Sequence, residues 1–386
     1  MSATRIFISI LGVVLGILTI RHVYSVGRTL NDHFVAAVVL GCMGFYLFLG
    51  LVAPEGARIW MMGGMIGLWG LFAAIDQPGG RAPPPAIRFL MGWPSQTAYA
   101  FALWGGLMWI LRAPLAWFLD RPMLWPGDAL VFPLGLAGLG TLHARLRGLR
   151  VNRHAVDGLP LRIVQLSDLH ASPLMHREEL DRLVERTNAL EPDVVFITGD
   201  LVMPFSEAHH PYLIEALSKL DAPTYACPGN HDLPILEQLS AELSRIGIPL
   251  LVDQSLVISP REGIRIEIVG VNFYWTRLHE RMRDAIPPAD ADATYRILLA
   301  HDPRVADAIP RGRFDLILSG HTHGGQVGLN MIGLRWTLLG CLGVRDQGWF
   351  SSRGARHYVH CGNWWIGLPP RMGVAGEIAV FEGRTR

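Results

Sequence analysis

The chain contains little cysteine and carries no excess of either charge. Its four cysteines, Cys42, Cys227, Cys341 and Cys361, show no paired spacing. This excludes the dense disulfide framework of small secreted domains and agrees with a reducing compartment. The 34 basic side chains are balanced by 33 acidic ones. A nucleic-acid-binding protein usually has a basic footprint, and this chain as a whole has none, so we expect no nucleic-acid partner.

Charge is also unevenly distributed along the chain. Residues 1–144 hold eight arginines and five acidic residues, whereas residues 145–386 hold the other 26 basic and 28 acidic residues. Twelve of the fifteen histidines also lie in the second part. A chain of 386 residues exceeds the usual size of one domain. The contrast in charge therefore indicates two regions, the first in lipid and the second in water.

The first region contains apolar stretches of roughly the length that crosses a bilayer. These stretches are Ile6–Ser25, Phe34–Ala53, Ile59–Ile75, Ser95–Leu111 and Ala129–Leu142. The first one lacks a small-residue cleavage site and is followed by further apolar stretches, so it is not interpreted as a cleaved signal peptide. We expect an α-helical transmembrane region over residues 1–144 with about five helices. Four spans, or a set of buried core helices, are the alternatives.

Basic residues predict the orientation of these spans. An Arg-rich linker over residues 145–160 follows the last span and contains Arg145, Arg147, Arg150 and Arg153. Short loops rich in Lys and Arg stay on the cytoplasmic side of a membrane. The chain is therefore expected to be a multi-pass protein of the cell (inner) membrane, with residues 161–386 forming a cytoplasmic domain.

The second region alternates strand-like apolar runs with helical patterns. Leu161–Leu166 and Val194–Ile197 flank a helical stripe over Met175–Leu190, and a second helix is expected around Leu239. The remaining runs favour strands, at Ile264–Val271, Tyr295–Ala300, Phe314–Ser319, Ala355–Cys361 and Gly376–Phe381. A βαβ beginning followed by a strand-rich second half predicts a layered α/β sandwich.

Five polar clusters follow these apolar runs, at the positions where the expected strands end. The clusters are Ser167-Asp168-Leu169-His170, Thr198-Gly199-Asp200, Pro228-Gly229-Asn230-His231-Asp232, Ala300-His301-Asp302 and Gly320-His321-Thr322-His323-Gly324-Gly325-Gln326. Loops at strand ends are where a rigid sheet can direct side chains to one point. The clusters offer enough side chains to ligate two metal ions.

The ligand types indicate which metals suit these clusters. Asp200 can bridge two cations because a carboxylate has two oxygens, and Asn230 offers a neutral amide oxygen. Imidazole nitrogens from several histidines make the set a mixture of N and O donors. Such a mixture suits Mn²⁺, Fe or Zn²⁺ better than Ca²⁺. Taken singly, each residue has a plainer interpretation, as a surface or core histidine or a turn residue.

Taken together, the clusters resemble the signature of the calcineurin-like metallophosphoesterases, over about residues 161–381. The resemblance implies a β-sandwich flanked by helices with a dinuclear metal site and no other cofactor-binding residues. One ion would be held by Asp168, His170, Asp200 and His323, and the other by Asp200, Asn230, His301 and His321, with Mn²⁺ preferred and Fe or Zn²⁺ as alternatives. His231 would face the phosphate, stabilising charge or protonating the leaving group, and Asp232 would orient His231. Many members carry a further acid three residues after the second-motif Asp, where this chain has Met203.

The expected function is that of a membrane-anchored, dinuclear-metal hydrolase acting on a phosphodiester or pyrophosphate. The extended Gly-His-Thr-His-Gly-Gly-Gln cluster resembles a membrane-associated branch that includes phosphodiesterases and the chlamydial-type hydrolase of UDP-2,3-diacylglucosamine in lipid A synthesis. The expected partners are the membrane and a phosphate-containing lipid or nucleotide-linked substrate, and no protein partner is implied. A protein or nucleotide phosphatase and a non-catalytic nucleotide-binding membrane sensor are the alternatives.

Two apolar loops and four arginines are candidates for substrate selection. The segments Asn272–Trp275 and Met331–Phe350 are rich in apolar and aromatic residues. They form either ordinary packing or an exposed rim that contacts the bilayer or acyl chains. The arginines Arg304, Arg345, Arg353 and Arg371 could bind a diphosphate, but a solvated surface role explains each of them equally well. They are therefore not included in the predicted site.

Overall fold

A computed structural model describes residues 148–171, 177–203, 210–326, 328–330, 333–364, 371 and 373–383. The expected membrane spans of residues 1–144 lie outside these residues, as does the start of the Arg-rich linker. Among the helices that are described, none is both long enough and apolar enough to cross a bilayer.

The first sheet has five strands in the order β1-β11-β2-β3-β4. Their bounds are β1 Arg150–Val156, β2 Ile163–Leu166, β3 Val194–Thr198, β4 Thr224–Cys227 and β11 Glu377–Gly383. β2, β3 and β4 run parallel to one another, whereas β11 pairs antiparallel with β2 and parallel with β1. The four residues of β2 and the five of β3 are all buried, as expected for parallel strands covered on both faces.

The second sheet has six strands in the order β5-β6-β7-β8-β10-β9. Their bounds are β5 Gln254–Arg261, β6 Ile264–Gly270, β7 Tyr295–Leu299, β8 Leu316–Ser319, β9 Gly348–Ser352 and β10 Ala355–Val359. β6, β7, β8 and β10 run parallel, and the two outer strands β5 and β9 pair antiparallel. The fold of the described domain is therefore α/β with two mixed sheets, which confirms the predicted class.

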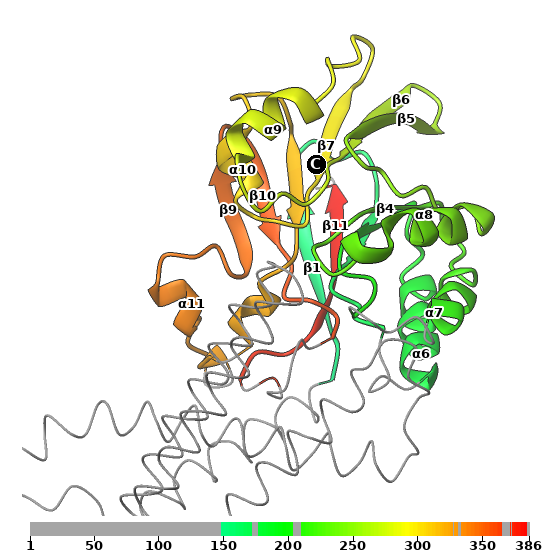
Figure 1. Cartoon of the computed structure of the whole chain (residues 1–386), viewed down its shortest axis with the longest axis vertical. Coiled ribbons are helices and arrows are strands. Elements are labelled where there is room, and N and C mark those ends of the chain that lie inside the picture. Colours follow the sequence, from blue (N-terminus) through cyan, green and yellow to red (C-terminus); the bar gives the residue numbers. More distant parts are fainter. Residues whose placement is uncertain are drawn as a thin grey trace, which may run out of the picture. The chain divides into compact units, whose positions relative to one another are not determined.

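Helices cover the outer face of each sheet, and Figure 1 shows them on opposite sides of the two sheets. The helices are α6 Arg177–Asn188, α7 His210–Leu217, α8 Leu236–Arg245, α9 Leu278–Ala285, α10 Val305–Ala308 and α11 Leu338–Cys341, with 3-10 turns η2 Leu233–Ile235 and η3 His323–Gly325. One apolar core lies between α6–α8 and the first sheet, a second between the two sheets, and a third between the second sheet and α9–α10. Burial of these three cores stabilises a layered sandwich.

The segment of the predicted linker from Arg150 to Val156 is part of the fold, and its assignment to a linker is corrected here. It forms strand β1, which pairs with β11 from Arg150–Glu377 to Val156–Gly383. The residues of β1 are mostly only half-buried, so their sequence lacks the continuous apolar run of the central strands. An edge strand whose partner lies more than 220 residues away leaves little local signal.

The strand directions bring the ends of many strands to one edge of the domain. β2, β3 and β4 end at this edge, and because β11 is antiparallel to β2, both β11 and its parallel neighbour β1 begin there. The second sheet contributes the ends of β7, β8 and β10. A buried hydrogen bond from the Gln165 side chain to the carbonyl of Ser319 joins β2 of the first sheet to β8 of the second. We call this the carboxyl edge, and the polar clusters lie on it.

Candidate metal centre

Five of the predicted ligands have a left-handed backbone conformation. The φ angles are 56° at Asp168, 46° at His170, 53° at Asp200, 72° at His321 and 51° at His323. This region is uncommon for residues other than glycine and costs free energy that the surrounding structure must offset. Strained residues of this kind concentrate at functional sites. The chain thus bends sharply at each strand end and turns these side chains inward.

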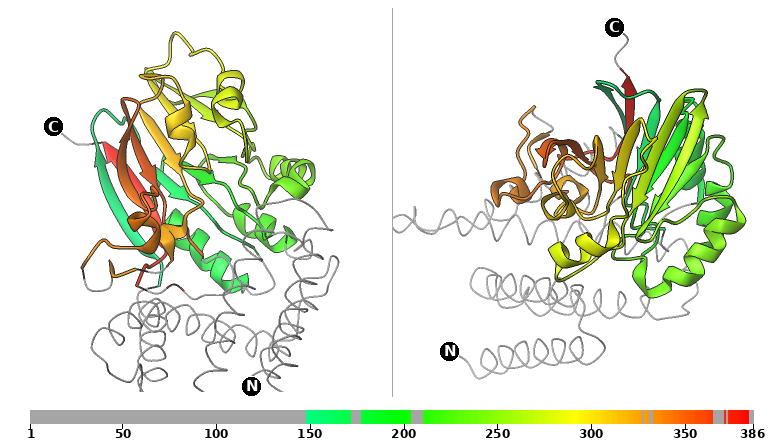
Figure 2. Two further views of the ribbon diagram at one scale, coloured as in Figure 1. Left: turned by 60° about the vertical axis from the view of Figure 1, so that its left-hand side comes forward. Right: turned by 90° about the horizontal axis from the view of Figure 1, so that it is seen from above.

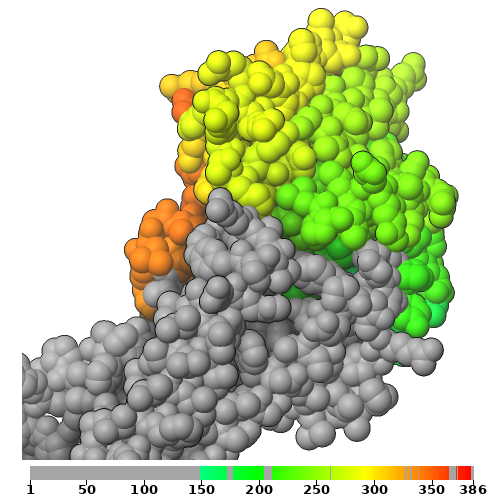
Figure 3. Space-filling model, viewed as in Figure 1, coloured from blue at the N-terminus to red at the C-terminus, as the bar shows by residue number. Residues whose placement is uncertain are grey.

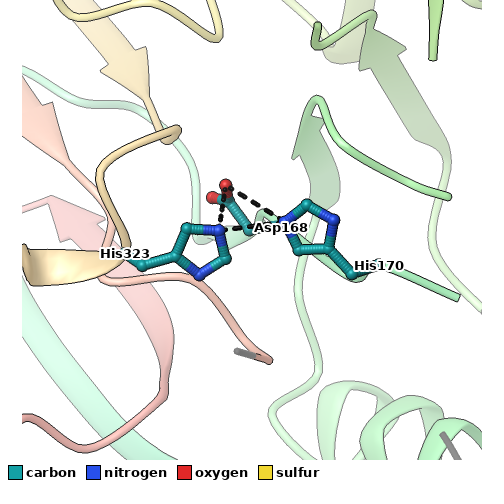
Figure 4. Close-up of side chains that lie close together, drawn as sticks. All are labelled: Asp168, His170 and His323. Atoms are coloured by element: carbon teal, nitrogen blue, oxygen red, sulfur yellow. Dashed lines mark hydrogen bonds and ion pairs between the residues drawn. The ribbon is translucent and has the colours of Figure 1, made fainter. Parts of the chain in front are cut away.

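Asp168, His170 and His323 converge on one point, as Figure 4 shows. The Nε2 atoms of His170 and His323 lie 2.9 Å apart, and Asp168 Oδ1 is 3.1 Å from Nε2 of His323 and 4.0 Å from Nε2 of His170. The two imidazole rings stack with a 19° interplanar angle. All three side chains are buried, so the arrangement encloses a small polar space among three donors.

Asp200 lies between this group and a second one. Its Oδ2 atom is 3.0 Å from Nε2 of His301 and 3.7 Å from Nε2 of His170. His301 and His321 complete the second group with Asp200, and their rings are 5.1 Å apart. Asn230 follows Gly229, whose backbone packs directly against the Asp200 carboxylate. The structure therefore brings the seven predicted ligands to one end of the domain, with Asp200 in the middle.

Backbone carbonyls set the orientation of two imidazoles. His301 Nδ1 lies 2.7 Å from the carbonyl of Thr198, and His323 Nδ1 lies 3.1 Å from the carbonyl of Trp364. Since a carbonyl accepts, each Nδ1 must carry a proton, so in the neutral ring the lone pair is on Nε2. This is how histidines that bind metals are usually held. In both rings the free nitrogen is the one that faces the carboxylates.

The donor atoms of these residues fit divalent cations. Asp200 Oδ2, Asn230 Oδ1 and His301 Nε2 are buried, and none of them has a hydrogen-bond partner among the described residues. Buried polar atoms are seldom left without a partner. With His323 protonated on Nδ1, its Nε2 lone pair points at Nε2 of His170 from 2.9 Å. A cation between these atoms would satisfy them together.

The charges around these carboxylates also suit cations. Although burial raises the pKa of Asp168 and of Asp200, neighbouring histidines lower both below their ordinary values. Burial lowers the pKa of His301, but Asp200 more than offsets this and raises it to about 10. Burial lowers the pKa of His170 and that of His321, the latter to about 4. Two ionised carboxylates are thus accompanied by neutral imidazoles at His170 and His321 and by a proton on His301, which a bound cation would replace.

Two glycines of the motifs are required for close approach. A Cβ atom on Gly229 would overlap the carboxylate and the backbone nitrogen of Asp200. A Cβ atom on Gly320 would overlap the hydroxyl of Ser167 and lie 2.5 Å from Asp168 Oδ2. Such distances are far below van der Waals contact, so the motif glycines allow the loops to pack against the ligands.

His231 lies beside the centre, but Asp232 does not orient it as predicted. The His231 ring packs edge-on against His170 at 5.0 Å, and its Nδ1 has no hydrogen-bond partner among the described residues. The Asp232 carboxylate instead accepts backbone N–H groups from Leu201, Val202 and Gly229. Asp232 bonds these groups because it lies between the loops that follow β3 and β4, where three backbone N–H groups need an acceptor. Asp232 therefore holds two ligand-bearing loops together.

Sequence reasoning missed two residues that hold the centre in place. Asn363 accepts a hydrogen bond from the backbone of Ser167 and follows β10 at the carboxyl edge, so the strand-end rule could have found it. Arg371 is buried and donates to the carbonyls of His323, Cys361, Gly362 and Trp364. The sequence alone does not place Arg371 in the site, because a lone arginine is usually solvated and no local pattern marks it as buried.

The other three arginines have local partners. Arg304 pairs with Asp302 at 2.7 Å, and Arg345 makes two hydrogen bonds to the Asp307 carboxylate. Arg353 donates to the carbonyl of Asp307. Each is therefore engaged with a neighbouring residue, in agreement with their omission from the predicted site.

The two apolar loops behave differently from each other. In the first, Phe273 is buried and packs its ring 5.2 Å from that of His321 and 5.9 Å from that of His301. In the second, Trp349 packs against Tyr358, whereas Trp336 and Leu342 are exposed. Packing thus explains Phe273 and Trp349, but it does not explain the exposed residues of the second loop.

Comparison with known proteins finds relatives of this domain. Residues 161–325 match the family model described as Calcineurin-like phosphoesterase. Phosphodiesterase YaeI of Escherichia coli (strain K12) is 31% identical over 183 residues, which are 46% of this chain and 66% of that protein. The uncharacterized metallophosphoesterase YkuE of Bacillus subtilis (strain 168) is 30% identical over 237 residues, which are 59% of this chain and 80% of that protein.

A third relative carries a membrane term in its name. The bovine (Bos taurus) transmembrane protein with metallophosphoesterase domain is 31% identical over 241 residues, which are 56% of this chain and 52% of that protein. The chain thus spans just under two thirds of YaeI and about half of the bovine relative.

Proposed function

The chain belongs to the calcineurin-like phosphoesterases, a family of metal-dependent phosphoester hydrolases, and from this premise we propose that it is a membrane-anchored phosphodiesterase with two divalent cations. One cation would be held by Asp168, His170, Asp200 and His323, and the other by Asp200, Asn230, His301 and His321. Mn²⁺ suits this mixture of carboxylate, amide and imidazole donors, with Fe and Zn²⁺ as alternatives. When bound, two such cations neutralise the phosphate oxygens and lower the pKa of an attacking water.

His231 is the residue of this chain that we assign to the reacting phosphate. It is not tied by a hydrogen bond at Nδ1 within the described residues, and its Nε2 lies 4.0 Å from Asp200 Oδ2. Burial lowers its pKa, so at neutral pH the ring is uncharged and offers one N–H donor. Such a donor can bind a phosphate oxygen. To protonate the leaving group, the ring would first have to take up a second proton, for example as negative charge develops on the phosphate.

The observation that carries this proposal is the environment of Asp200. Nε2 atoms of three histidines, His170, His231 and His301, lie between 3.0 and 4.0 Å from one carboxylate oxygen. That oxygen has no hydrogen-bond partner among the described residues. A carboxylate so placed can accept cations on two sides, which supports its assignment as the bridging ligand.

The membrane part of the proposal rests on the sequence of residues 1–144, with its five apolar stretches and few charges. We propose a multi-pass protein of the inner membrane whose phosphoesterase domain faces the cytoplasm, because the Arg-rich segment follows the last stretch. The proposed substrate is a phosphodiester or pyrophosphate linked to a lipid or nucleotide. UDP-2,3-diacylglucosamine is the first compound to test, because the Gly-His-Thr-His-Gly-Gly-Gln cluster resembles the branch that cleaves it.

The test uses detergent-purified full-length protein, Mn²⁺ and two substrates, bis(p-nitrophenyl) phosphate and UDP-2,3-diacylglucosamine. We expect hydrolysis of the diester to disappear after EDTA treatment, to return with Mn²⁺, and to fall at least 100-fold in Asp200→Asn. Asp315→Asn is the matched control and should keep wild-type activity. Asp315 is exposed and precedes β8, whereas the loop with His321 and His323 follows the other end of this strand. Release of UMP from the second substrate would place the enzyme in lipid A synthesis. Full turnover by Asp200→Asn would refute the assignment of Asp200 as bridging ligand.

A further inference from the structure

The exposed apolar residues of the domain are concentrated in one short segment. Six large apolar side chains are exposed among the described residues, and four of them are Leu334 (54%), Trp336 (36%), Leu342 (72%) and Val344 (41%). We call residues 333–345, which include α11, the apolar protrusion. Figure 3 shows the part of the chain around α11 (orange) standing out from the body of the domain. Contiguous exposed apolar surface usually marks an interaction site.

Hydrogen bonds attach the apolar protrusion to the metal-centre loop. Thr322, which lies between His321 and His323, donates to the carbonyl of Asp346 at 2.6 Å. The Asp346 carboxylate in turn accepts from Thr337, whose hydroxyl accepts the N–H of Gly340 in α11. Asp346 and Thr337 are both buried. A short chain of hydrogen bonds therefore links the apolar protrusion to the loop that carries His321 and His323.

The chain also enters the domain at the metal-centre edge. Arg150 begins β1 beside Glu377 of β11, and its N–H is bonded to the carbonyl of Gly376. Gly376 is closely packed against Leu149 and Asn363, since a Cβ atom on it would lie 3.1 Å from the Leu149 side chain and 2.7 Å from the carbonyl oxygen of Asn363. Asn363 in turn accepts a hydrogen bond from the backbone of Ser167, next to Asp168. Figures 1 and 2 show that α11 and the start of β1 lie at the same end of the domain.

The length of the connection limits how far this edge can be from the expected membrane spans. The last expected span ends at Leu142, and the described fold begins to pack at Leu149. Seven residues reach at most about 25 Å when fully extended. A domain joined in this way keeps Leu149, next to the start of β1, within about 25 Å of the end of the last expected span.

The composition of the apolar protrusion fits a lipid surface better than a protein. Residues 331–345 contain no acidic residue, and they contain one tryptophan and five leucine or valine residues. Because Arg345 is paired with Asp307, the exposed Arg335 is the cation of this segment that an anionic headgroup can attract. Tryptophan, leucine and arginine together are typical of segments that lie in the headgroup region of a membrane, where anionic lipids attract the cations.

We propose that the apolar protrusion docks onto the lipid surface and thereby presents the metal centre to phosphoesters of amphiphiles held in that surface. This inference rests on the proposed function, because it assumes a phosphoesterase joined to a membrane. It adds the surface that makes the contact and the class of substrate that this contact selects.

The first experiment compares two phosphodiesters with the same leaving group, using full-length protein with Mn²⁺ in mixed micelles containing anionic lipid. The substrates are hexadecyl p-nitrophenyl phosphate, which partitions into the micelles, and the soluble methyl p-nitrophenyl phosphate. For Leu342→Asp we expect kcat/KM to fall at least fivefold on the hexadecyl ester and to stay within twofold on the methyl ester. Leu256→Asp is the matched control, at an exposed leucine of the outer strand β5, and should leave both values unchanged.

A second measurement reports docking without activity. In a Cys42→Ser background, Cys341 of α11 is the exposed thiol among the described residues, since Cys227 and Cys361 are buried. A fluorophore on Cys341 should be quenched by brominated phospholipid in proteoliposomes. The same fluorophore on Leu256→Cys, in a background that also carries Cys341→Ser, should not be quenched.

Each outcome decides the proposal. Lipid docking is overturned if Leu342→Asp leaves kcat/KM unchanged on both esters or lowers it equally on both. It is also overturned if the fluorophore on Cys341 is not quenched. A loss on both esters together with a changed sedimentation mass would instead assign the apolar protrusion to a second copy of the chain. If the wild type cleaves neither ester with Mn²⁺, the proposed function fails, and the quenching result alone then decides whether the protrusion meets lipid.

Discussion

Replacing Asp232 by Asn tests the role that the structure gives to this residue. Its Oδ1 accepts N–H groups of Leu201 at 2.9 Å and Val202 at 3.2 Å, and its Oδ2 accepts that of Gly229 at 2.8 Å. The first two donors follow β3 and the third follows β4, so one buried carboxylate joins the loops that carry Asp200 and Asn230. In Asp232→Asn, one acceptor oxygen remains for Leu201 and Val202. The amide NH₂ would then face the N–H of Gly229, and that buried donor would lose its partner.

The expected cost follows from this change of partners. A hydrogen bond to a charged group contributes about 1.5–3 kcal/mol, and an unsatisfied buried donor costs about 1–3 kcal/mol. Because these figures describe overlapping effects, we expect about 2 kcal/mol of destabilisation for Asp232→Asn and roughly twice as much for Asp232→Ala. In a domain of this size, about 2 kcal/mol lowers Tm by about 4–8 °C. The rate of the folded variant should stay within about threefold, because the Asp232 carboxylate accepts backbone N–H groups and not a hydrogen bond from His231 Nδ1.

The assay measures tryptophan fluorescence during thermal unfolding and initial rates on bis(p-nitrophenyl) phosphate at 20 °C, both with full-length protein in detergent. A pH of 8 keeps the carboxylate ionised, since burial and the neighbouring Asp200 raise the pKa of Asp232 to about 7. Asp315→Asn is the control, at an exposed carboxylate that accepts one backbone N–H, from Arg296. A variant that melts like the wild type but loses 100-fold in rate would refute this reasoning and return Asp232 to the role of orienting His231.

Three further predictions follow from buried groups near the carboxyl edge. Arg371→Met removes the guanidinium that donates to the carbonyl of His323, so Mn²⁺ affinity measured by calorimetry should fall about 10-fold; unchanged affinity would contradict a positioning role. Gly320→Ala would force the Asp168 carboxylate aside, so it should remove activity while Gly312→Ala, at an open turn, should not. Burial lowers the pKa of His357 to about 3, so below pH 6.5 the unfolded state binds the extra proton and stability decreases as the pH falls towards 3. From pH 6.5 to 5 this amounts to about 2 kcal/mol, and His357→Gln should show a correspondingly shallower fall in Tm.

The residues of the candidate metal centre could be predicted because each polar cluster directly follows an apolar run. Asp168 follows β2 and Asp200 follows β3, and both strands consist of buried residues. A short apolar run followed by polar residues can be recognised in a sequence. Strand β1 gave no such signal, because its half-buried residues belong to an edge. Arg371 gave none either, since a buried guanidinium satisfied by backbone carbonyls has no local signature.

The role of Asp232 could not be read from the sequence, although its presence in the site could. Its neighbour His231 suggested a side-chain pair, but the nearest donors in space are backbone N–H groups of the loops after β3 and β4. Adjacent residues point in directions that depend on backbone angles, and these angles are set by the packing of the loops. The exposed apolar protrusion is a similar case, because its sequence is compatible with either a core or a surface.

By itself the sequence determined which donors are available and that they lie at strand ends, because residue type and apolar periodicity are local properties. Only the tertiary structure decided which donors meet. His170 and His323 are 153 positions apart, yet their Nε2 atoms lie within 2.9 Å. That contact depends on two sheets packing with their strand ends at one edge and on left-handed backbone angles at both residues. Such angles are costly for a single residue, and they persist because the packing of the whole domain holds them in place.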